Sequence, residues 1–156
     1  MTLTVFMKKY GNIVIIGIIF IIAILLILFP PFGKMECKIK SAPADLSAEY
    51  DYSAKFSFWI VNDLTVKEVV SSDDKEVLEN YKSDIEEQYR IYDSINSINN
   101  NIVLNDKSVV STFYVNYDKL DAKQVKKLDN DYLKKKITIG KLKKIYKNNG
   151  ASCHYK

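Results

Sequence analysis

The longest apolar segment of the chain places the strongest constraint on its fold. The run from Gly11 to Phe29 carries no charged side chain, and from Ile13 onward only Gly17 and Ala23 are not Ile, Val, Leu or Phe. A helix of these nineteen residues is about 28 Å long, close to the roughly 30 Å hydrocarbon core of a bilayer. A helix buried in a soluble core, the alternative, would usually carry a polar face, which this segment lacks. The run therefore predicts a transmembrane helix over residues 11–29.

This segment divides the chain into four predicted parts. A cleaved signal peptide usually ends in small residues, but here the run ends in Phe29-Pro30-Pro31-Phe32, so we expect an uncleaved signal anchor. Proline ends the helix, and the polar stretch after it is typical of a linker. The parts are a cytoplasmic tail at 1–10, the anchor at 11–29, a linker at 30–49 and an extracytoplasmic domain at 50–156.

The orientation of the anchor follows from the cysteines. With the amino terminus included, three positive charges precede the anchor and three follow it closely, so the lysines do not decide the orientation. Cys37 and Cys153 are the only cysteines, one at each end of the soluble part. That arrangement predicts a disulfide, and disulfides persist outside the cytoplasm. We therefore expect a single-pass protein of the cell membrane with a cytoplasmic N-terminus and an extracytoplasmic C-terminal domain.

Alternating patterns predict an antiparallel sheet of about four strands. Between Tyr50 and Ile60, aromatic and aliphatic residues alternate with polar ones, which indicates a strand with one buried face. Trp59 breaks the alternation; we expect it to pack beneath a loop or a helix end, with a binding-site aromatic as the alternative. The other predicted strands are 64–70, 102–104 and 108–117, with turns at 61–63 and 105–107.

Capping residues predict one long and two short helices packed on this sheet. Asp73 precedes the long amphipathic helix, and Asp121 precedes a short one. Thr138 is expected to cap the last helix, which stops at Asn149-Gly150. The predicted fold class is therefore α+β, with one N-terminal transmembrane helix followed by a small domain.

The order of these features resembles a known family. A leading Cys37, an alternating aromatic strand, an amphipathic helix, the segment STFYVNYDKLDAKQVKKL and a lysine-rich helix ending in NNGASC resemble the YehR-like bacterial extracytoplasmic lipoproteins. The resemblance spans Cys37 to Cys153. It implies an α+β domain at the cell envelope with no assigned activity, and it therefore contributes no catalytic residues. A lipoprotein carries small residues before its modified cysteine, whereas Lys34-Met35-Glu36 precede Cys37, so the membrane helix would serve as the anchor.

The motifs of several enzyme classes and metal sites are missing from the sequence. It contains no glycine-rich phosphate loop, no G-x-S-x-G and no H-E-x-x-H. His154 is the only histidine, so a zinc site would need distant carboxylates, and a catalytic Cys153-His154 pair would compete with the disulfide. Asp129-Asn130-Asp131 begins like a calcium loop but lacks its glycine and final glutamate. We expect no enzyme activity, no metal and no cofactor.

Charge is unevenly distributed along the chain, whose net charge is +4. Residues 30–117 contain nine basic and fifteen acidic side chains, whereas residues 118–156 contain twelve lysines and four aspartates. Clustered lysines can attract an anionic surface, although lysines on a solvated face are the common alternative. The predicted anion-binding residues are Lys126, Lys127, Lys134, Lys135, Lys136, Lys141, Lys144 and Lys147.

Two hypotheses for the function remain open. The first is a membrane-anchored binding or structural module at the bacterial cell envelope, which meets anionic lipid headgroups, wall polymer or an envelope protein. The second is an envelope hydrolase that uses carboxylates of the acidic long helix and the strand ends, which would have to converge in a cleft. The modest net charge and the expected outside location argue against nucleic acid as a partner.

Overall fold

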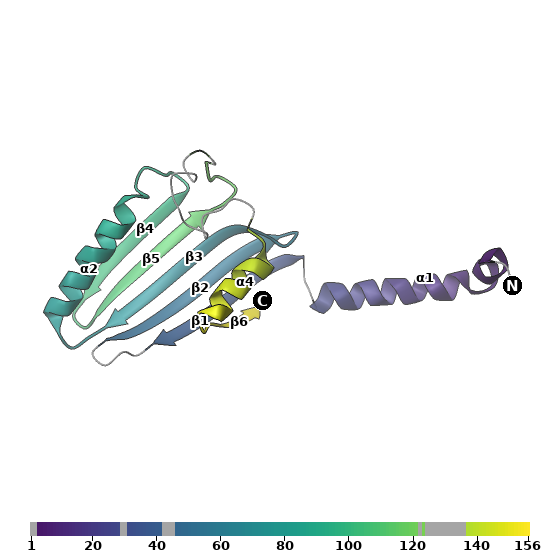
Figure 1. Ribbon diagram of the computed structural model, residues 1–156, viewed down its shortest axis with the longest axis horizontal. Coiled ribbons are helices and arrows are strands. Elements are labelled where there is room, and N and C mark those ends of the chain that lie inside the picture. The colour runs from purple at the N-terminus through teal and green to yellow at the C-terminus, as the bar shows by residue number, and fades with distance from the viewer. Residues whose placement is uncertain (1–2, 29–30, 42–45, 122, 124–136) are drawn as a thin grey trace. The chain divides into compact units, whose positions relative to one another are not determined.

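The computed structural model of the chain describes residues 3–28, 31–41, 46–121, 123 and 137–156, with side chains from Ile15 onward (Figure 1). The chain forms two compact units, Met1–Pro31 and Phe32–Lys156. Two predictions fall outside the described residues. One is most of the short helix expected after Asp121, and the other is five of the eight predicted anion-binding lysines, namely Lys126, Lys127, Lys134, Lys135 and Lys136.

The first unit contains one helix, α1, which covers Leu3–Leu28. The predicted cytoplasmic tail is therefore helical from Leu3 onward. The side chains from Ile15 to Leu28 are exposed. Within the residues whose side chains are described, no helix is long and apolar enough to cross a membrane. The transmembrane helix expected over 11–29 is thus not found among them.

The described residues of the second unit form one antiparallel sheet of six strands, where about four were expected. Its strand order is β4-β5-β3-β2-β1-β6 (Figure 1). The strands are β1 (Phe32–Ser41), β2 (Ser47–Ser57), β3 (Ile60–Ser71), β4 (Ile98–Asn105), β5 (Ser108–Asn116) and β6 (Ser152–Tyr155).

The two strands that the prediction missed lie at the ends of this unit. β1, at Phe32–Ser41, lies within the segment 30–49 that was predicted as a linker, and β6 follows the last helix. Met35 and Cys37 on β1 are buried, while Lys34, Glu36 and Lys38 alternate with them and face the other way. This alternation is visible in the sequence, but Ser41, Pro43 and Asp45 favoured a linker. β1 is stable as a strand because it pairs with β2 on one side and β6 on the other.

The first hairpin turns earlier than predicted. The expected turn at 61–63 is wrong: β2 and β3 are joined by the two residues Phe58 and Trp59, and Val61 already pairs with Phe56. The Asn-Asp pair at 62–63 suggested a turn, but these residues belong to β3. The second hairpin turns at Asp106-Lys107, within the predicted turn at 105–107. Its first strand was predicted too short, because β4 begins at Ile98 and not at residue 102.

Helices α2 (Lys75–Arg90) and α4 (Ile139–Asn148) cover the same face of the sheet. Phe113 on β5 contacts rings of α2 and its end, and Tyr52 on β2 stacks on Tyr146 of α4. Tyr52 pairs with Val66 in register and Val66 pairs with Phe113, so the three side chains share one face. α2 therefore lies over β4 and β5, and α4 over β1 and β6, on the inner face of the sheet.

The caps of these helices correct one prediction and confirm another. The N-cap of α2 is Asp74, not Asp73; its carboxylate accepts hydrogen bonds from the amides of Glu76 and Val77. Thr138 caps α4 as predicted. Gly150 follows the helix with a φ of 85°, the left-handed conformation expected at that stop.

Candidate functional site

Cys37 and Cys153 form the disulfide predicted from the sequence. They stand opposite each other in the register of β1 and β6, and their sulfur atoms are bonded. Both side chains lie on the inner face, where Cys37 is buried in the hydrophobic core. The bond fastens the C-terminal strand to the first strand of the unit, across 116 residues of sequence.

The described part of the predicted lysine cluster lies on α4. Lys141, Lys144 and Lys147 are exposed and follow one another at intervals of three residues, so they run along one side of the helix. Lys143, between them, is half-buried and lies over the ring of Tyr155, 4.1 Å from its centre. Three of the eight predicted anion-binding lysines are therefore placed on one accessible surface.

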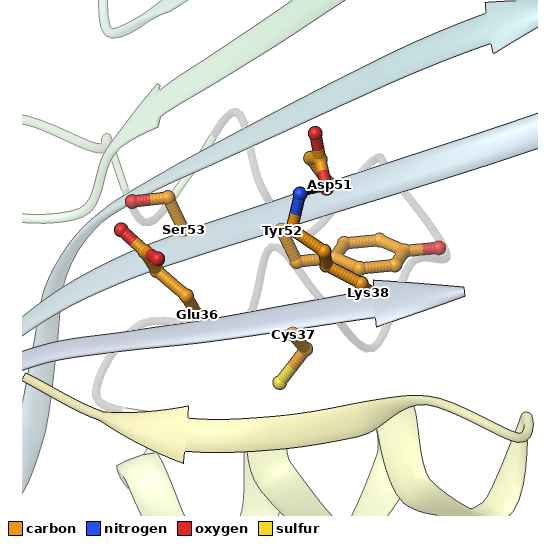
Figure 2. Close-up of a pocket in the computed structure, with 6 residues that line it drawn as sticks. All are labelled: Glu36, Cys37, Lys38, Asp51, Tyr52 and Ser53. Carbon is orange, nitrogen blue, oxygen red and sulfur yellow. Dashed lines mark ion pairs between the residues drawn. The ribbon is translucent and has the colours of Figure 1, made fainter. Parts of the chain in front are cut away.

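The outer face of the sheet carries a shallow pocket of about 260 Å³ between β1 and β2. It is lined by Glu36, Lys38, Asp51 and Ser53, which face outward, and by Cys37 and Tyr52, whose side chains belong to the inner face (Figure 2). The ammonium group of Lys38 is 2.9 Å from Asp51, its partner in register on β2. Asp51 holds the pKa of Lys38 above its usual value. The charges that line this pocket are thus paired with neighbouring side chains.

Glu36 is the centre of a second group of charges at this pocket. Its carboxylate lies 2.6 Å from Lys156 and 2.7 Å from Lys34, and His154 is 3.6 Å away. The hydrogen bond from Lys156, followed by that from Lys34, lowers the pKa of Glu36 from 4.5 to about 2. Glu36 is therefore ionised at neutral pH and occupied by its own lysines, an arrangement typical of a structural ion cluster. It also binds the C-terminal residue to β1.

The acidic residues of α2, which the hydrolase hypothesis would use, are solvent-facing. Glu79 and Glu86 pair with Lys75 and Lys82 one turn earlier along the helix. Each of these pairs spans four residues on an exposed surface, the usual arrangement of a solvated helix face. Glu68, by contrast, is an acid that is buried in the core. It belongs to β3, and the sequence analysis did not single it out.

Glu68 is 8% exposed and lies on the inner face between β3 and α2. Its carboxylate accepts hydrogen bonds from the hydroxyls of Tyr81 at 2.6 Å, Ser111 at 3.2 Å and Tyr50. Burial, followed by the hydrogen bond to Glu68, raises the pKa of Tyr50 and of Tyr81. Both hydroxyls therefore stay protonated as donors. The signal in the sequence was the alternation of Leu64, Val66, Glu68 and Val70, which places this acid among inward-facing side chains.

Exposed aromatic rings gather at the end of the sheet where β2 turns into β3. Trp59 was expected to be packed beneath other residues, but it is 45% exposed, and its neighbour Phe58 is 68% exposed. Phe32, at the start of β1, is 52% exposed and contacts Phe58 with ring centres 4.6 Å apart. We call Phe32, Phe58 and Trp59 the aromatic end.

The turn that carries two of these rings is strained. Phe58 and Trp59 have φ values of 50° and 62°, in the left-handed region that two-residue hairpin turns require and that Asn-Gly normally supplies. Such a conformation costs on the order of 1 kcal/mol or more for a bulky residue. Contacts to α4 hold the turn in place, because the carbonyl of Trp59 accepts a hydrogen bond of 2.8 Å from the amide of Ile139.

The architecture resembles that of two solved bacterial proteins. The fold is similar to that of YehR. The NMR structure of YehR from E. coli covers 76% of this chain and 88% of its own length, at 15% identity and a TM-score of 0.53. The NMR structure of a protein from Streptococcus pneumoniae TIGR4 covers 77% and 84%, at 11% identity and a TM-score of 0.50. No protein-family model and no curated protein matches the sequence.

The resemblance to YehR-like proteins predicted from the sequence is thereby confirmed at the level of the fold. At these identities the similarity shows the fold alone. The function has to be argued from the residues of this chain.

Proposed function

We propose that this protein is a membrane-anchored binding or structural module of the bacterial cell envelope, with α1 in the membrane and the unit Phe32–Lys156 outside the cytoplasm. The observation that carries the proposal is the disulfide between Cys37 and Cys153 in the unit that follows the apolar helix. Disulfides are rare in the reducing cytoplasm and persist in exported proteins. An exported domain behind an apolar helix is the arrangement of a signal anchor.

The surface of α1 supports the membrane attachment. All side chains from Ile15 to Leu28 are apolar and exposed within their unit. Soluble proteins rarely leave a contiguous apolar surface of this extent uncovered. Because no side of the segment from Ile15 to Leu28 carries a polar side chain, lipid would surround this segment completely.

The lysines of α4 support an anionic partner in the envelope, either lipid headgroups, wall polymer or an acidic protein. Lys141, Lys144 and Lys147 are exposed together, and the five further lysines at 126, 127 and 134–136 precede them in the sequence. Near an anionic membrane each lysine contributes about 1 kcal/mol, and the attraction fades within about 8 Å at physiological salt. The binding we propose is therefore weak and sensitive to salt.

Membrane attachment and sidedness can be tested on the full chain in its host membrane. The protein should remain in carbonate-washed membranes, and a membrane-impermeant thiol reagent should label the cysteines only after an external reductant is added. Replacing Ile18 and Ile21 by lysine should release the protein, whereas leucine at both positions should not. Recovery of the unaltered protein in the soluble fraction, or free thiols without reductant, would contradict the proposal.

Anion binding can be tested with the full chain in neutral nanodiscs. Sedimentation with anionic vesicles and, separately, with purified wall polymer at low salt distinguishes the two sources of negative charge. The triple variant Lys141→Glu, Lys144→Glu, Lys147→Glu should lose binding. The control variant Lys75→Glu, Lys82→Glu, Lys107→Glu changes the net charge equally but lies elsewhere and should retain it. Equal loss in both variants would show that net charge alone, and not this surface, attracts the partner.

A further inference from the structure

We propose that the aromatic end, formed by Phe32, Phe58 and Trp59, inserts into the headgroup region of the bilayer that holds α1. This inference rests on the membrane attachment proposed above and adds a second, specific contact between the chain and lipid. It assigns a role to three side chains that the core does not use.

The exposure of these rings is the first observation. Each of the three is about half exposed or more, and Phe32 and Phe58 pack edge to face on each other instead of on the core. Clustered exposed aromatic rings mark a surface that contacts lipid or another molecule. Trp and other aromatic side chains are enriched where a membrane protein meets the interface, because their rings suit the boundary between hydrocarbon and water.

The backbone of the turn is the second observation. Phe58 and Trp59 both occupy the left-handed region, where Asn and Gly would fit without strain. Strained residues persist at sites where the side chain serves a function. The turn is also braced, since Val61 donates a hydrogen bond of 3.0 Å to the carbonyl of Ile137, and Ile139 donates one to Trp59. The rings are thus held outward on a fixed support.

The short link between α1 and Phe32 is the reason for choosing lipid as the partner of the aromatic end. Phe32 follows Leu28, the last residue of α1, by four positions, and an extended chain of that length spans at most about 14 Å. A bilayer that holds the helix to its last residue is therefore within reach of Phe32. Phe58 is in contact with Phe32 and Trp59 is the next residue, so the other rings come with it.

Positive charge at the same end of the sheet fits an anionic headgroup layer. Lys141 is exposed in the first turn of α4. It lies two residues after Ile139, whose amide donates a hydrogen bond to the carbonyl of Trp59. Apolar rings with adjacent lysines are the combination that binds to the surface of an anionic membrane.

Trp59 is the only tryptophan in the sequence, so its fluorescence reports on this end alone. The full chain is reconstituted in phosphatidylcholine vesicles with and without phosphatidylglycerol, and flotation confirms attachment. Lipids brominated near the glycerol end of their acyl chains should quench Trp59, and aqueous acrylamide should quench it several-fold less than in the denatured chain. Phosphatidylglycerol should strengthen the bromolipid quenching.

Variants that keep Trp59 provide the matched comparison. Phe32→Ser with Phe58→Asn should reduce bromolipid quenching several-fold. The control Ile91→Ser with Val103→Ser removes two exposed apolar side chains that do not belong to the aromatic end. It should leave the bromolipid quenching of Trp59 unchanged. If the chain floats while Trp59 stays open to acrylamide and is not quenched by bromolipid, the inference is overturned and the membrane attachment stands. Protection from acrylamide without bromolipid quenching would indicate a protein contact and also overturn it. A chain that does not float overturns both.

Discussion

The hydroxyl of Tyr81 on α2 donates a hydrogen bond of 2.6 Å to the carboxylate of Glu68 on β3. Tyr50 and Ser111 donate to the same carboxylate from the neighbouring strands. A buried carboxylate is costly unless its oxygens accept hydrogen bonds, and here three hydroxyls supply them. The cluster therefore joins the long helix to three strands by polar contacts in an otherwise apolar layer.

Tyr81→Phe should destabilise the folded unit by about 1.5–3 kcal/mol. The substitution keeps the ring but removes one hydrogen bond to a buried charged group, and such bonds contribute about 1.5–3 kcal/mol. Urea unfolding of the oxidised protein measures the effect. Tyr114→Phe, on the outer face of the sheet, is the control and should change the free energy of unfolding much less. Equal effects of the two substitutions would show that the hydrogen bond from Tyr81 to Glu68 does not stabilise the folded unit.

Loss of the disulfide should destabilise the second unit by about 4–5 kcal/mol. Cys37 and Cys153 are separated by 116 residues, and closing a loop of that length restricts the unfolded chain by about this amount on the chain-entropy model. The double variant Cys37→Ser, Cys153→Ser and the reduced unaltered protein should unfold at the same urea concentration. An unaltered midpoint after reduction would indicate that pairing of β6 with β1 does not depend on the bond.

The stability that Glu36 contributes should disappear in acid. Its pKa is about 2 in the folded protein against an ordinary value of 4.5. A lowered folded-state pKa adds stability that is complete above the unfolded-state value and is lost as the pH falls through the folded-state value. Glu36→Gln should therefore be less stable than the unaltered protein at neutral pH, and the difference should shrink between pH 4.5 and about 2.

The cause of this shift can be tested by titration. Carboxyl carbon NMR should show Glu36 titrating near 2 in the unaltered protein and at higher pH in Lys156→Gln, because Lys156 is the largest cause of the lowered pKa. A midpoint near the ordinary 4.5 in the unaltered protein would mean that these lysines do not hold the carboxylate in solution.

Replacing the strained turn should stabilise the protein. Phe58→Asn with Trp59→Gly introduces the residues that a left-handed two-residue turn favours and should raise the free energy of unfolding by about 1–2 kcal/mol. Phe32→Ser is the control, because it removes an exposed ring without changing the turn, and it should give no such gain. Thermal and urea unfolding measure both. A destabilised turn variant would show that packing of the two rings outweighs the backbone strain.

Signals that act within a few residues were readable from the sequence. The Thr138 cap, the stop at Gly150 and the turn of the second hairpin each depend on neighbours in the chain, and all three are confirmed. The pairing of Cys37 with Cys153 was also readable, because a chain with two cysteines offers one intramolecular disulfide. The choice between Asp73 and Asp74 as N-cap was not, since adjacent acids give the same local signal.

Relations between distant residues were decided only by the tertiary structure. β1 is a strand because it pairs with β2 along its whole length and residues 152–155 return to pair with its other edge, and the sequence of its own charged segment does not show these partners. The hairpin turns at Phe58-Trp59 because pairing with β2 and β5 and the bond to Ile137 extend β3 through residues 61–63, which outweighs the local preference of Asn62-Asp63 for a turn. Burial and strand pairing sum contributions over the whole sheet, so they override local conformational preferences of about 1 kcal/mol.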